Sequence, residues 1–222
     1  MKTRLLSTIL LSFVVFISYA QERIVSSIPV PEGFTRTKAD TWGGYLRQLD
    51  LKPEGTPVKL YDGTVKEYQD GAYAIIRMDV GNMDLQQCAD ACMRLRAEYL
   101  WQRHRYSEIH FNFTNGFRAD YTKWAEGYRV HFDKKNTFWS LDASRDYSYH
   151  TFMRYLRLVF SFANTASLEK ETTKVELNDL RIGDMFLKGG YPGHAMIIVD
   201  MAEDASGRKA ILVAQSYMPA QD

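Results

Sequence analysis

Two cysteines and one histidine are the residues of this sequence best suited to covalent chemistry. Cys88 and Cys92 lie four residues apart in a stretch with helical spacing, and His194 follows several glycines at the start of an apolar strand. Side chains four apart on a helix have Cβ atoms about 5–6 Å apart, whereas a disulfide needs about 3.8 Å. Both cysteines are therefore predicted to be free thiols, either inert in the core or used in catalysis.

The C-terminal segment predicts a partner for His194. If residues 202–207 form a hairpin loop, Met201 faces Arg208 on the opposite strand. In the same register His194 faces Gln215. Directly opposed side chains lie about 5 Å apart, so Gln215 is expected to hold the imidazole ring.

Two other polar residues compete with Gln215 for this role. A slip of one residue in the register would bring Ser216 to the same position. Asp200 is excluded, because six residues along a strand place it roughly 20 Å from His194.

Together these residues form a candidate catalytic set for nucleophilic chemistry. Cys88 would be the nucleophile, His194 the base and Gln215 the residue that orients it. A side-chain amide beside the Cys88 backbone N–H would bind the developing oxyanion, and Gln87 is favoured over Gln86 for this role.

The position of Cys88 in its helix leaves a second interpretation open. If the helix begins near Asp84, Cys88 lies about one turn inside it, where the helix dipole helps a thiolate only in part. Cys88 also belongs to an apolar stripe at 3/4 spacing, and buried cysteines usually serve packing. The stripe consists of Leu85, Cys88, Cys92, Leu95 and Tyr99.

The elements around these residues predict an α+β fold. Helices are expected in the middle of the chain and antiparallel strands at its end, which is typical of that class. The expected helices span residues 42–49, 84–104 and 148–162, and the expected strands span residues 57–61, 72–80, 109–113, 185–187, 194–201 and 208–217. The helix that carries Cys88 would then pack on a C-terminal antiparallel sheet.

The N-terminus is typical of a secretory signal peptide. Lys2 and Arg4 precede an apolar stretch over residues 5–17, and residues 18–20 provide a small-residue cleavage site. We therefore expect a signal peptide over residues 1–20, a single domain over residues 21–222, and a periplasmic or secreted location. An uncleaved anchor is disfavoured, because the apolar stretch is shorter than the roughly 20 residues that span a bilayer.

Composition excludes several function classes. The precursor carries 28 basic and 27 acidic residues, a net charge of +1, which favours neither nucleic acid nor an anionic membrane surface as a partner. No apolar segment of transmembrane length follows the signal peptide. The histidines are scattered without metal-ligand spacing, so neither a metal nor another cofactor is expected.

Four segments resemble a family of secreted Bacteroidota proteins called domain of unknown function 4846. They cover residues 84–101 (DLQQCADACMRLRAEYLW), 109–117 (IHFNFTNGF), 183–202 (GDMFLKGGYPGHAMIIVDMA) and 212–221 (LVAQSYMPAQ). The resemblance implies export and assigns no activity. It also implies that this chain is truncated at its C-terminus, because family members continue beyond this last segment.

A second resemblance is to the papain-like CHAP and NlpC/P60 cell-wall hydrolases. Gln87-Cys88 opens a helix, Gly193-His194 opens a strand, and Gln215 lies on the next strand, in the order of those families. The resemblance implies a papain-like fold and a Cys–His amidase or peptidase acting on peptidoglycan stem peptides. The sequence departs from these families in Ala89 after the cysteine, in Ala214 at the CHAP-type acidic position, and in the long separation of cysteine and histidine.

Two functions follow from these observations. One is cysteine hydrolysis of peptidoglycan or peptide substrates. The other is a non-catalytic envelope protein in which Cys88 is a core residue and aromatic side chains bind glycan or peptide. The aromatic residues available for such a groove are Tyr121, Trp124, Tyr128, Phe138, Trp139, Tyr147 and Tyr149.

Overall fold

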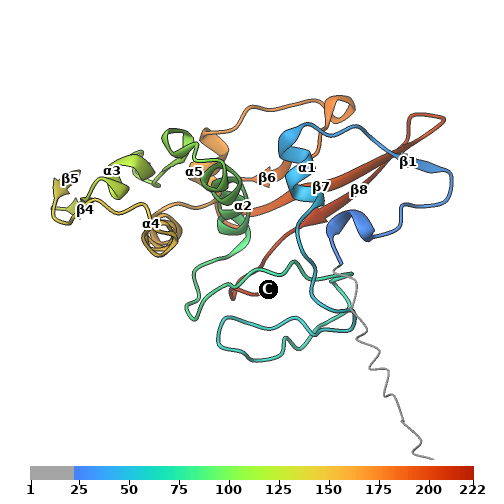
Figure 1. Cartoon of the computed structure of the whole chain (residues 1–222), viewed down its shortest axis with the longest axis horizontal. Helices are drawn as coiled ribbons and strands as arrows, with labels where there is room; N and C mark the ends of the chain where they lie inside the picture. The colour runs from blue at the N-terminus through green and yellow to red at the C-terminus, as the bar shows by residue number, and fades with distance from the viewer. Residues whose placement is uncertain (1–22) are drawn as a thin grey trace, which may run out of the picture.

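The computed structural model describes residues 23–222, so the predicted signal peptide lies outside the described residues. The described chain combines five α-helices with eight strands, all of whose pairings are antiparallel. This confirms the predicted α+β class (Figure 1). The helices are α1 (Thr41–Arg47), α2 (Cys88–Gln102), α3 (Tyr121–Ala125), α4 (Tyr149–Phe162) and α5 (Thr165–Lys170); the strands are β1 (Phe34–Arg36), β2 (His110–Asn112), β3 (Arg118–Asp120), β4 (Tyr128–Phe132), β5 (Thr137–Leu141), β6 (Met185–Lys188), β7 (His194–Asp204) and β8 (Lys209–Ala214).

The main sheet is built around the long strand β7. β1 pairs with one end of β7 and β6 with the other, while β8 pairs with β7 from Ile197 to Glu203. Ile197 pairs with both β6 and β8, so these two strands lie on opposite edges of β7. The β2–β3 and β4–β5 pairs form separate hairpins, and β4–β5 lies at the opposite end of the molecule from the β7–β8 turn (Figure 1).

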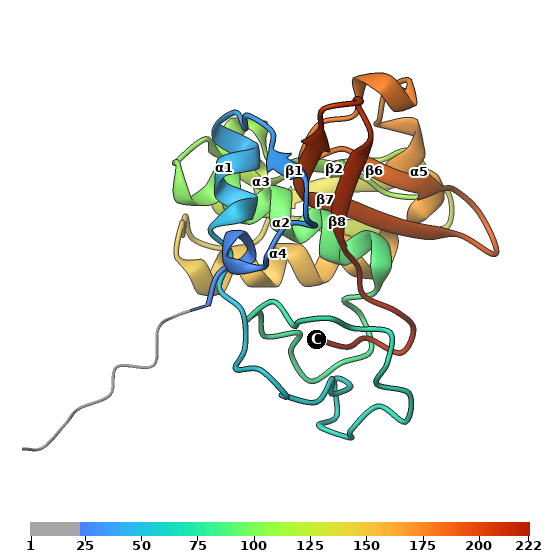
Figure 2. The same cartoon turned by 90° about the vertical axis from the view of Figure 1, so that its right-hand side faces the viewer.

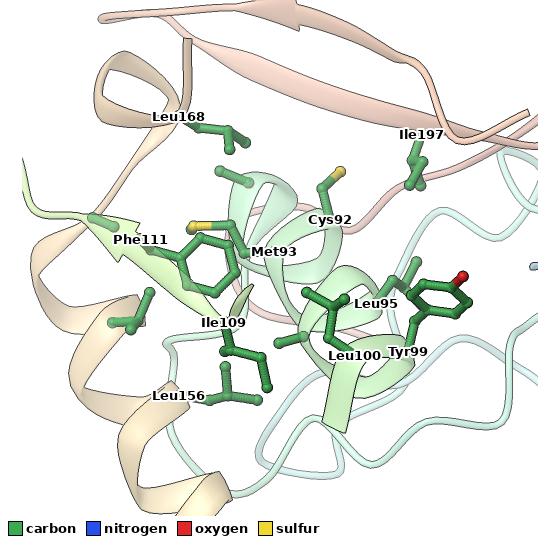
Figure 3. Packing of buried hydrophobic residues seen from close by; sticks show 14 of the residues in the cluster. Cys92, Met93, Leu95, Tyr99, Leu100, Ile109, Phe111, Leu156, Leu168 and Ile197 are labelled. Atoms are coloured by element: carbon green, nitrogen blue, oxygen red, sulfur yellow. The ribbon is translucent and has the colours of Figure 1, made fainter. Parts of the chain in front are cut away.

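Helix α2 is the centre of the core and packs on β7, as predicted. Its sequence is rich in strong helix formers and contains neither Gly nor Pro. Figure 2 shows α2 behind the sheet with α4 below it, so nearly every face of α2 is covered. Cys92 points from α2 toward the strand that carries Ile197, while Met93 lies beside Phe111 on the other side (Figure 3).

A buried carboxylate ties the N-terminal elements to β7. Asp200 is 4% exposed and binds Arg36 of β1 at 2.7 Å and Arg47 of α1 at 2.6 Å. A buried charge is stable only when it is paired in this way. Asp200 therefore serves the packing of the sheet, consistent with its exclusion as a partner of His194.

Several predicted elements are confirmed. The predicted helix 148–162 is α4, and its Ser148 caps the helix by accepting a hydrogen bond from the Thr151 backbone N–H at 3.2 Å. The predicted strand 109–113 is shortened to β2, but its apolar alternation holds, since Ile109, Phe111 and Phe113 are all buried.

The predicted strands over residues 57–61 and 72–80 are wrong. These residues form loops that meet their neighbours at single bridges, Lys59 with Val65, Leu60 with Gln221, and Leu51 with Ile76. Each pairing ends after its single bridge, so no ladder forms despite the apolar residues. In Figures 1 and 2 these loops lie together below the sheet, beside the C-terminus.

The predicted hairpin loop is also wrong. The strands continue to Asp204, and the turn covers residues 205–208. The carboxylate of Asp204 accepts hydrogen bonds from the backbone N–H groups of Ser206 and Arg208, both at 2.9 Å, which fixes the turn beyond the predicted position. As a result Met201 pairs with Ile211 and not with Arg208.

No helix within residues 23–222 combines the length and the apolar character needed to cross a membrane.

Candidate functional site

Cys88 is the first residue of α2, and this corrects its predicted position one turn inside the helix. Gln87 is the N-cap, and its backbone N–H donates to the Asp90 carboxylate at 3.0 Å. The predicted start near Asp84 fails because that carboxylate instead accepts from the Ala220 backbone N–H at 2.6 Å. At the helix start the backbone N–H groups have no intrahelical partner, so Cys88 lies at the end of α2 where hydrogen-bond donors are left over.

The two thiols differ in their surroundings. Both are free, as predicted; Cys88 is half-buried, whereas Cys92 is buried at 3% exposure. Burial raises the pKa of the Cys92 thiol to about 12, with smaller contributions from Cys88 and Asp90. Cys92 is therefore a packing residue, and Cys88 is the thiol that solvent can reach.

His194 is the first residue of β7. The position before it has no room for a residue larger than glycine. A Cβ atom at Gly193 would lie 2.3 Å from Thr165 Oγ1 and 2.4 Å from the Gly190 carbonyl oxygen. Glycine at position 193 thus lets the chain pass α5 and enter the sheet with the imidazole at the strand start.

Gln215 binds His194, as the sequence predicted. Gln215 Oε1 lies 2.8 Å from His194 Nε2, and because an amide oxygen only accepts, the ring nitrogen donates. This leaves His194 Nδ1 as the nitrogen that can take a proton. The contact arises from a register other than the predicted one, since Ile197 pairs with Ala214 and Gln215 lies just beyond β8.

Tyr217 completes the surroundings of the imidazole. Its ring centroid lies 4.9 Å from that of His194 at an interplanar angle of 32°. The side chain of Tyr217 is 43% exposed, so the ring stands at the surface beside the histidine. His194 is thus held by a hydrogen bond on one nitrogen and an aromatic contact.

Ser216 links the two parts of the site and does not replace Gln215. Its hydroxyl donates to the Gln86 carbonyl oxygen at 3.3 Å and lies 2.8 Å from the Gln221 carbonyl oxygen. A cavity of about 50 Å³ is lined by Gln86, Gln215 and Ser216 together with apolar side chains of α2 and β7. The segment before Cys88 and the segment after β8 are therefore neighbours.

The structure does not join Cys88 to His194. No hydrogen bond connects Cys88 Sγ with the His194 ring, although both residues are described. His194 begins β7 and is bound to Gln215. Cys88 lies at the start of α2, the helix that packs on β7.

The two glutamines before Cys88 have different surroundings. Gln86 is 4% exposed, and its Oε1 accepts from the Arg94 guanidinium, so its side chain is part of a buried network. Gln87 is less buried, and its Nε2 donates one hydrogen to Asp84 at 3.1 Å. The Gln87 amide carries a second hydrogen besides the one donated to Asp84, and its role as an oxyanion donor stays a prediction.

Two neighbours of the site were not predicted from the sequence. Asp90 is 6% exposed, and burial raises its pKa to about 7 while one carboxylate oxygen, Oδ1, has no hydrogen-bond partner. Arg94 anchors the segment before Cys88 through Gln86 and the Asp79 carbonyl oxygen. Only Asp90 carries a signal that could have been recognised, since an acidic residue three positions after the N-cap is typical of a capping box.

The aromatic residues considered for a binding groove are divided between core and surface. Tyr121 and Trp124 are buried at 0% and 7% exposure. Tyr128 and Phe138 are exposed on the β4–β5 hairpin, and Tyr149 donates to Glu98 at 2.6 Å. Among residues 23–222 no cluster of three or more His, Cys, Asp or Glu side chains is arranged to hold a metal ion.

The fold and the site define an α+β protein in which a helix with an N-terminal cysteine packs on an antiparallel sheet that carries a His–Gln pair. The chain belongs to the family described as domain of unknown function (4846), whose model matches residues 24–222. Comparison with curated proteins and with solved structures gives no match.

Proposed function

We propose that this protein is a papain-like cysteine hydrolase, an amidase or peptidase that cleaves the stem peptides of peptidoglycan. The observation that carries the proposal is the 2.8 Å hydrogen bond from His194 Nε2 to Gln215 Oε1 in a chain whose Cys88 opens helix α2. A base with one nitrogen fixed and the other free, together with a half-buried thiol at a helix N-terminus, has the parts that thiol catalysis needs.

In the proposed mechanism His194 Nδ1 takes the proton of the Cys88 thiol, and the thiolate attacks the carbonyl carbon of the substrate amide. The carbonyl oxygen becomes an oxyanion that the Cys88 backbone N–H and the Gln87 side-chain amide stabilise. His194 gives its proton to the leaving amine, and the C–N bond breaks to leave a thioester on Cys88. Water then attacks the thioester with His194 as base, which releases a carboxylic acid and restores the thiol.

The separation of Cys88 from His194 agrees with this mechanism if the contact forms when substrate binds. Catalytic hydrogen bonds in substrate-free enzymes are often long and tighten in the complex. The order of Cys88, His194 and Gln215 along the chain supports the resemblance to CHAP and NlpC/P60 hydrolases. Export by the predicted signal peptide, to the periplasm or beyond the cell of a Bacteroidota species, would bring the protein to its substrate.

A non-catalytic binding protein is the alternative, and the missing Cys88–His194 hydrogen bond is the observation that favours it. The exposed Tyr128 and Phe138 of the β4–β5 hairpin would then provide stacking surfaces for glycan or peptide. Hydrolysis distinguishes the two functions, since a binding protein releases no fragments.

Digestion of purified peptidoglycan tests the proposal. We expect soluble fragments with new amino groups, detected by mass spectrometry, and a loss on the order of 10³-fold or more in Cys88→Ala and His194→Ala. Cys92→Ala and His150→Ala are the matched controls, since Cys92 is a packing residue and His150 is exposed outside the site. Hydrolysis that persists in Cys88→Ala, or its absence in the unaltered protein, would reject the cysteine mechanism.

A further inference from the structure

A cavity beside β8 reaches the residue that holds His194. It has a volume of about 410 Å³, and its wall follows β8 through Leu212 and Val213 to Gln215. Val58 and Ile75, from the loops below the sheet, also line it. The cavity therefore has a largely apolar lining that includes Gln215, the residue whose side chain binds His194.

Lys66 gives this cavity a positive charge. It lines the cavity together with Tyr217, and its Nζ lies 4.9 Å from the centroid of the Tyr217 ring. No acidic side chain within residues 23–222 forms a salt bridge with Lys66. The carboxylate of Asp222, which also lines the cavity, is occupied by the Lys52 ammonium and by the Lys59 backbone N–H.

The backbone around Lys66 is held in place before any ligand arrives. Its N–H donates to the Val58 carbonyl oxygen at 3.0 Å, and its carbonyl oxygen accepts from Gln69 Nε2 at 2.6 Å. Gln69 Oε1 also accepts from the Val58 N–H at 2.8 Å, so one side chain closes the loop. Because the loop is already ordered, binding a ligand at Lys66 loses little conformational entropy.

The distance from Lys66 to the proposed catalytic histidine limits what can bind. The Tyr217 ring centroid lies 4.9 Å from the Lys66 ammonium and 4.9 Å from the His194 ring. The ammonium is thus no farther from the imidazole than about three residues of extended peptide, at roughly 3.4 Å per residue.

We infer that this cavity is the subsite for the C-terminal end of a peptide substrate, with Lys66 binding its free carboxylate and the apolar walls receiving a hydrophobic side chain. The inference rests on the proposed function and specifies its substrate class. The cleaved bond would lie within about three residues of the C-terminus. An amidated or internal peptide lacks the group that Lys66 recognises.

Calorimetric titration of two related ligands tests the subsite. The ligands are N-acetyl-alanyl-phenylalanine with a free carboxylate and the same compound with a C-terminal amide, and Cys88→Ala prevents turnover. In this background we expect the acid to bind about five- to tenfold more tightly than the amide, as for a partly exposed charge pair. Adding Lys66→Met should abolish the preference, Lys66→Arg should keep most of it, and Lys59→Met, an exposed lysine on the same loop, should leave it unchanged.

Three results would overturn the subsite: equal binding of acid and amide, no binding of either at millimolar concentration, or a preference that survives Lys66→Met. A failure of the proposed function would give a different set of results. If the acid is preferred through Lys66 but peptidoglycan is never hydrolysed, the subsite stands and the catalytic mechanism fails. If hydrolysis occurs without any preference for the acid, only the subsite fails.

Discussion

The first and second turns of helix α2 carry one cysteine each, and their surroundings differ sharply. Cys88 is half-buried at the helix start, where unpaired backbone N–H groups collect. Cys92, one turn later, is 3% exposed and points into the core beneath β7 (Figure 3). The first turn therefore has the properties of a reactive site and the second those of packing, although the sequence assigns both cysteines to one apolar stripe.

The largest expected difference between the two turns is thiol reactivity. A thiol with a pKa of about 12, such as Cys92, is only ~10⁻⁴ ionised at pH 8, and its sulfur is also shielded by the core. We therefore expect iodoacetamide to alkylate Cys88 at least about a hundredfold faster than Cys92. Intact-mass measurements on the single-cysteine variants Cys92→Ala and Cys88→Ala give the two rates separately.

Urea-unfolded samples of the same variants provide the control, because the two thiols should then react at similar rates. Equal rates in the folded protein would remove the distinction between the two turns. Faster alkylation of Cys92 would reverse it.

The second prediction concerns Asp90, which lies between the two cysteines. Burial raises its pKa to about 7, so between about pH 4 and pH 7 the folded protein holds a proton that the unfolded chain has lost. Stability is therefore full below about pH 4 and decreases as the pH rises to about 7, by on the order of 3 kcal/mol. Asp90→Asn cannot ionise, and its side-chain oxygen still accepts from the Gln87 N–H. The free energy of unfolding of this variant should therefore not decrease over this pH range.

Urea unfolding between pH 4 and pH 8 measures this effect as the difference between Asp90→Asn and the unaltered protein. Asp62→Asn, at a fully exposed carboxyl, is the matched control and should leave the slope over this range unchanged. A constant difference between Asp90→Asn and the unaltered protein would show that Asp90 titrates normally and that the first turn is well solvated.

The third prediction compares the same substitution in both turns. Cys92→Ser places a hydroxyl in an apolar site and should lower the free energy of unfolding by about 2 kcal/mol. Cys88→Ser exchanges a half-buried group at a helix start, where Ser is readily accommodated. This substitution should change the free energy of unfolding by less than about 0.5 kcal/mol. Urea denaturation at pH 7 measures both values, and similar losses would mean that Cys88 is a core residue as well.

Much of this arrangement could be predicted from periodicity. The apolar spacing over residues 148–162 identified α4, and the glycines before His194 located the start of β7. The pairing of His194 with Gln215 was also predicted, although from the wrong hairpin turn. Side chains near the end of a strand reach diagonal neighbours as well as direct ones, so the contact survived the error in register.

The start of α2 was predicted at the wrong residue, because the role of Asp84 depends on a residue far away in the sequence. Asp84 resembles a helix cap, but its carboxylate accepts from the Ala220 N–H and the Gln87 side chain. Lys66 and Tyr217 likewise meet only in the folded chain. Local sequence patterns do not predict such long-range contacts. In this protein these contacts decide where Cys88 lies and which charge faces the cavity.

The smallest expected effect concerns the contact between His194 and Gln215, which lies apart from both turns of α2. Gln215→Leu removes the acceptor of the His194 Nε2 proton, so the ring loses its fixed tautomer and orientation. We expect peptidoglycan hydrolysis to fall about tenfold, in line with the loss of an orienting partner. The free energy of unfolding should change by less than about 0.5 kcal/mol, since Gln215 is only partly buried.

Two control variants separate loss of the hydrogen bond to His194 from loss of an amide as such. Gln215→Asn keeps an amide that is too short to reach the ring. Gln69→Leu removes an amide that holds only the Lys66 loop. Hydrolysis that is unchanged in Gln215→Leu would mean that Tyr217 alone orients His194.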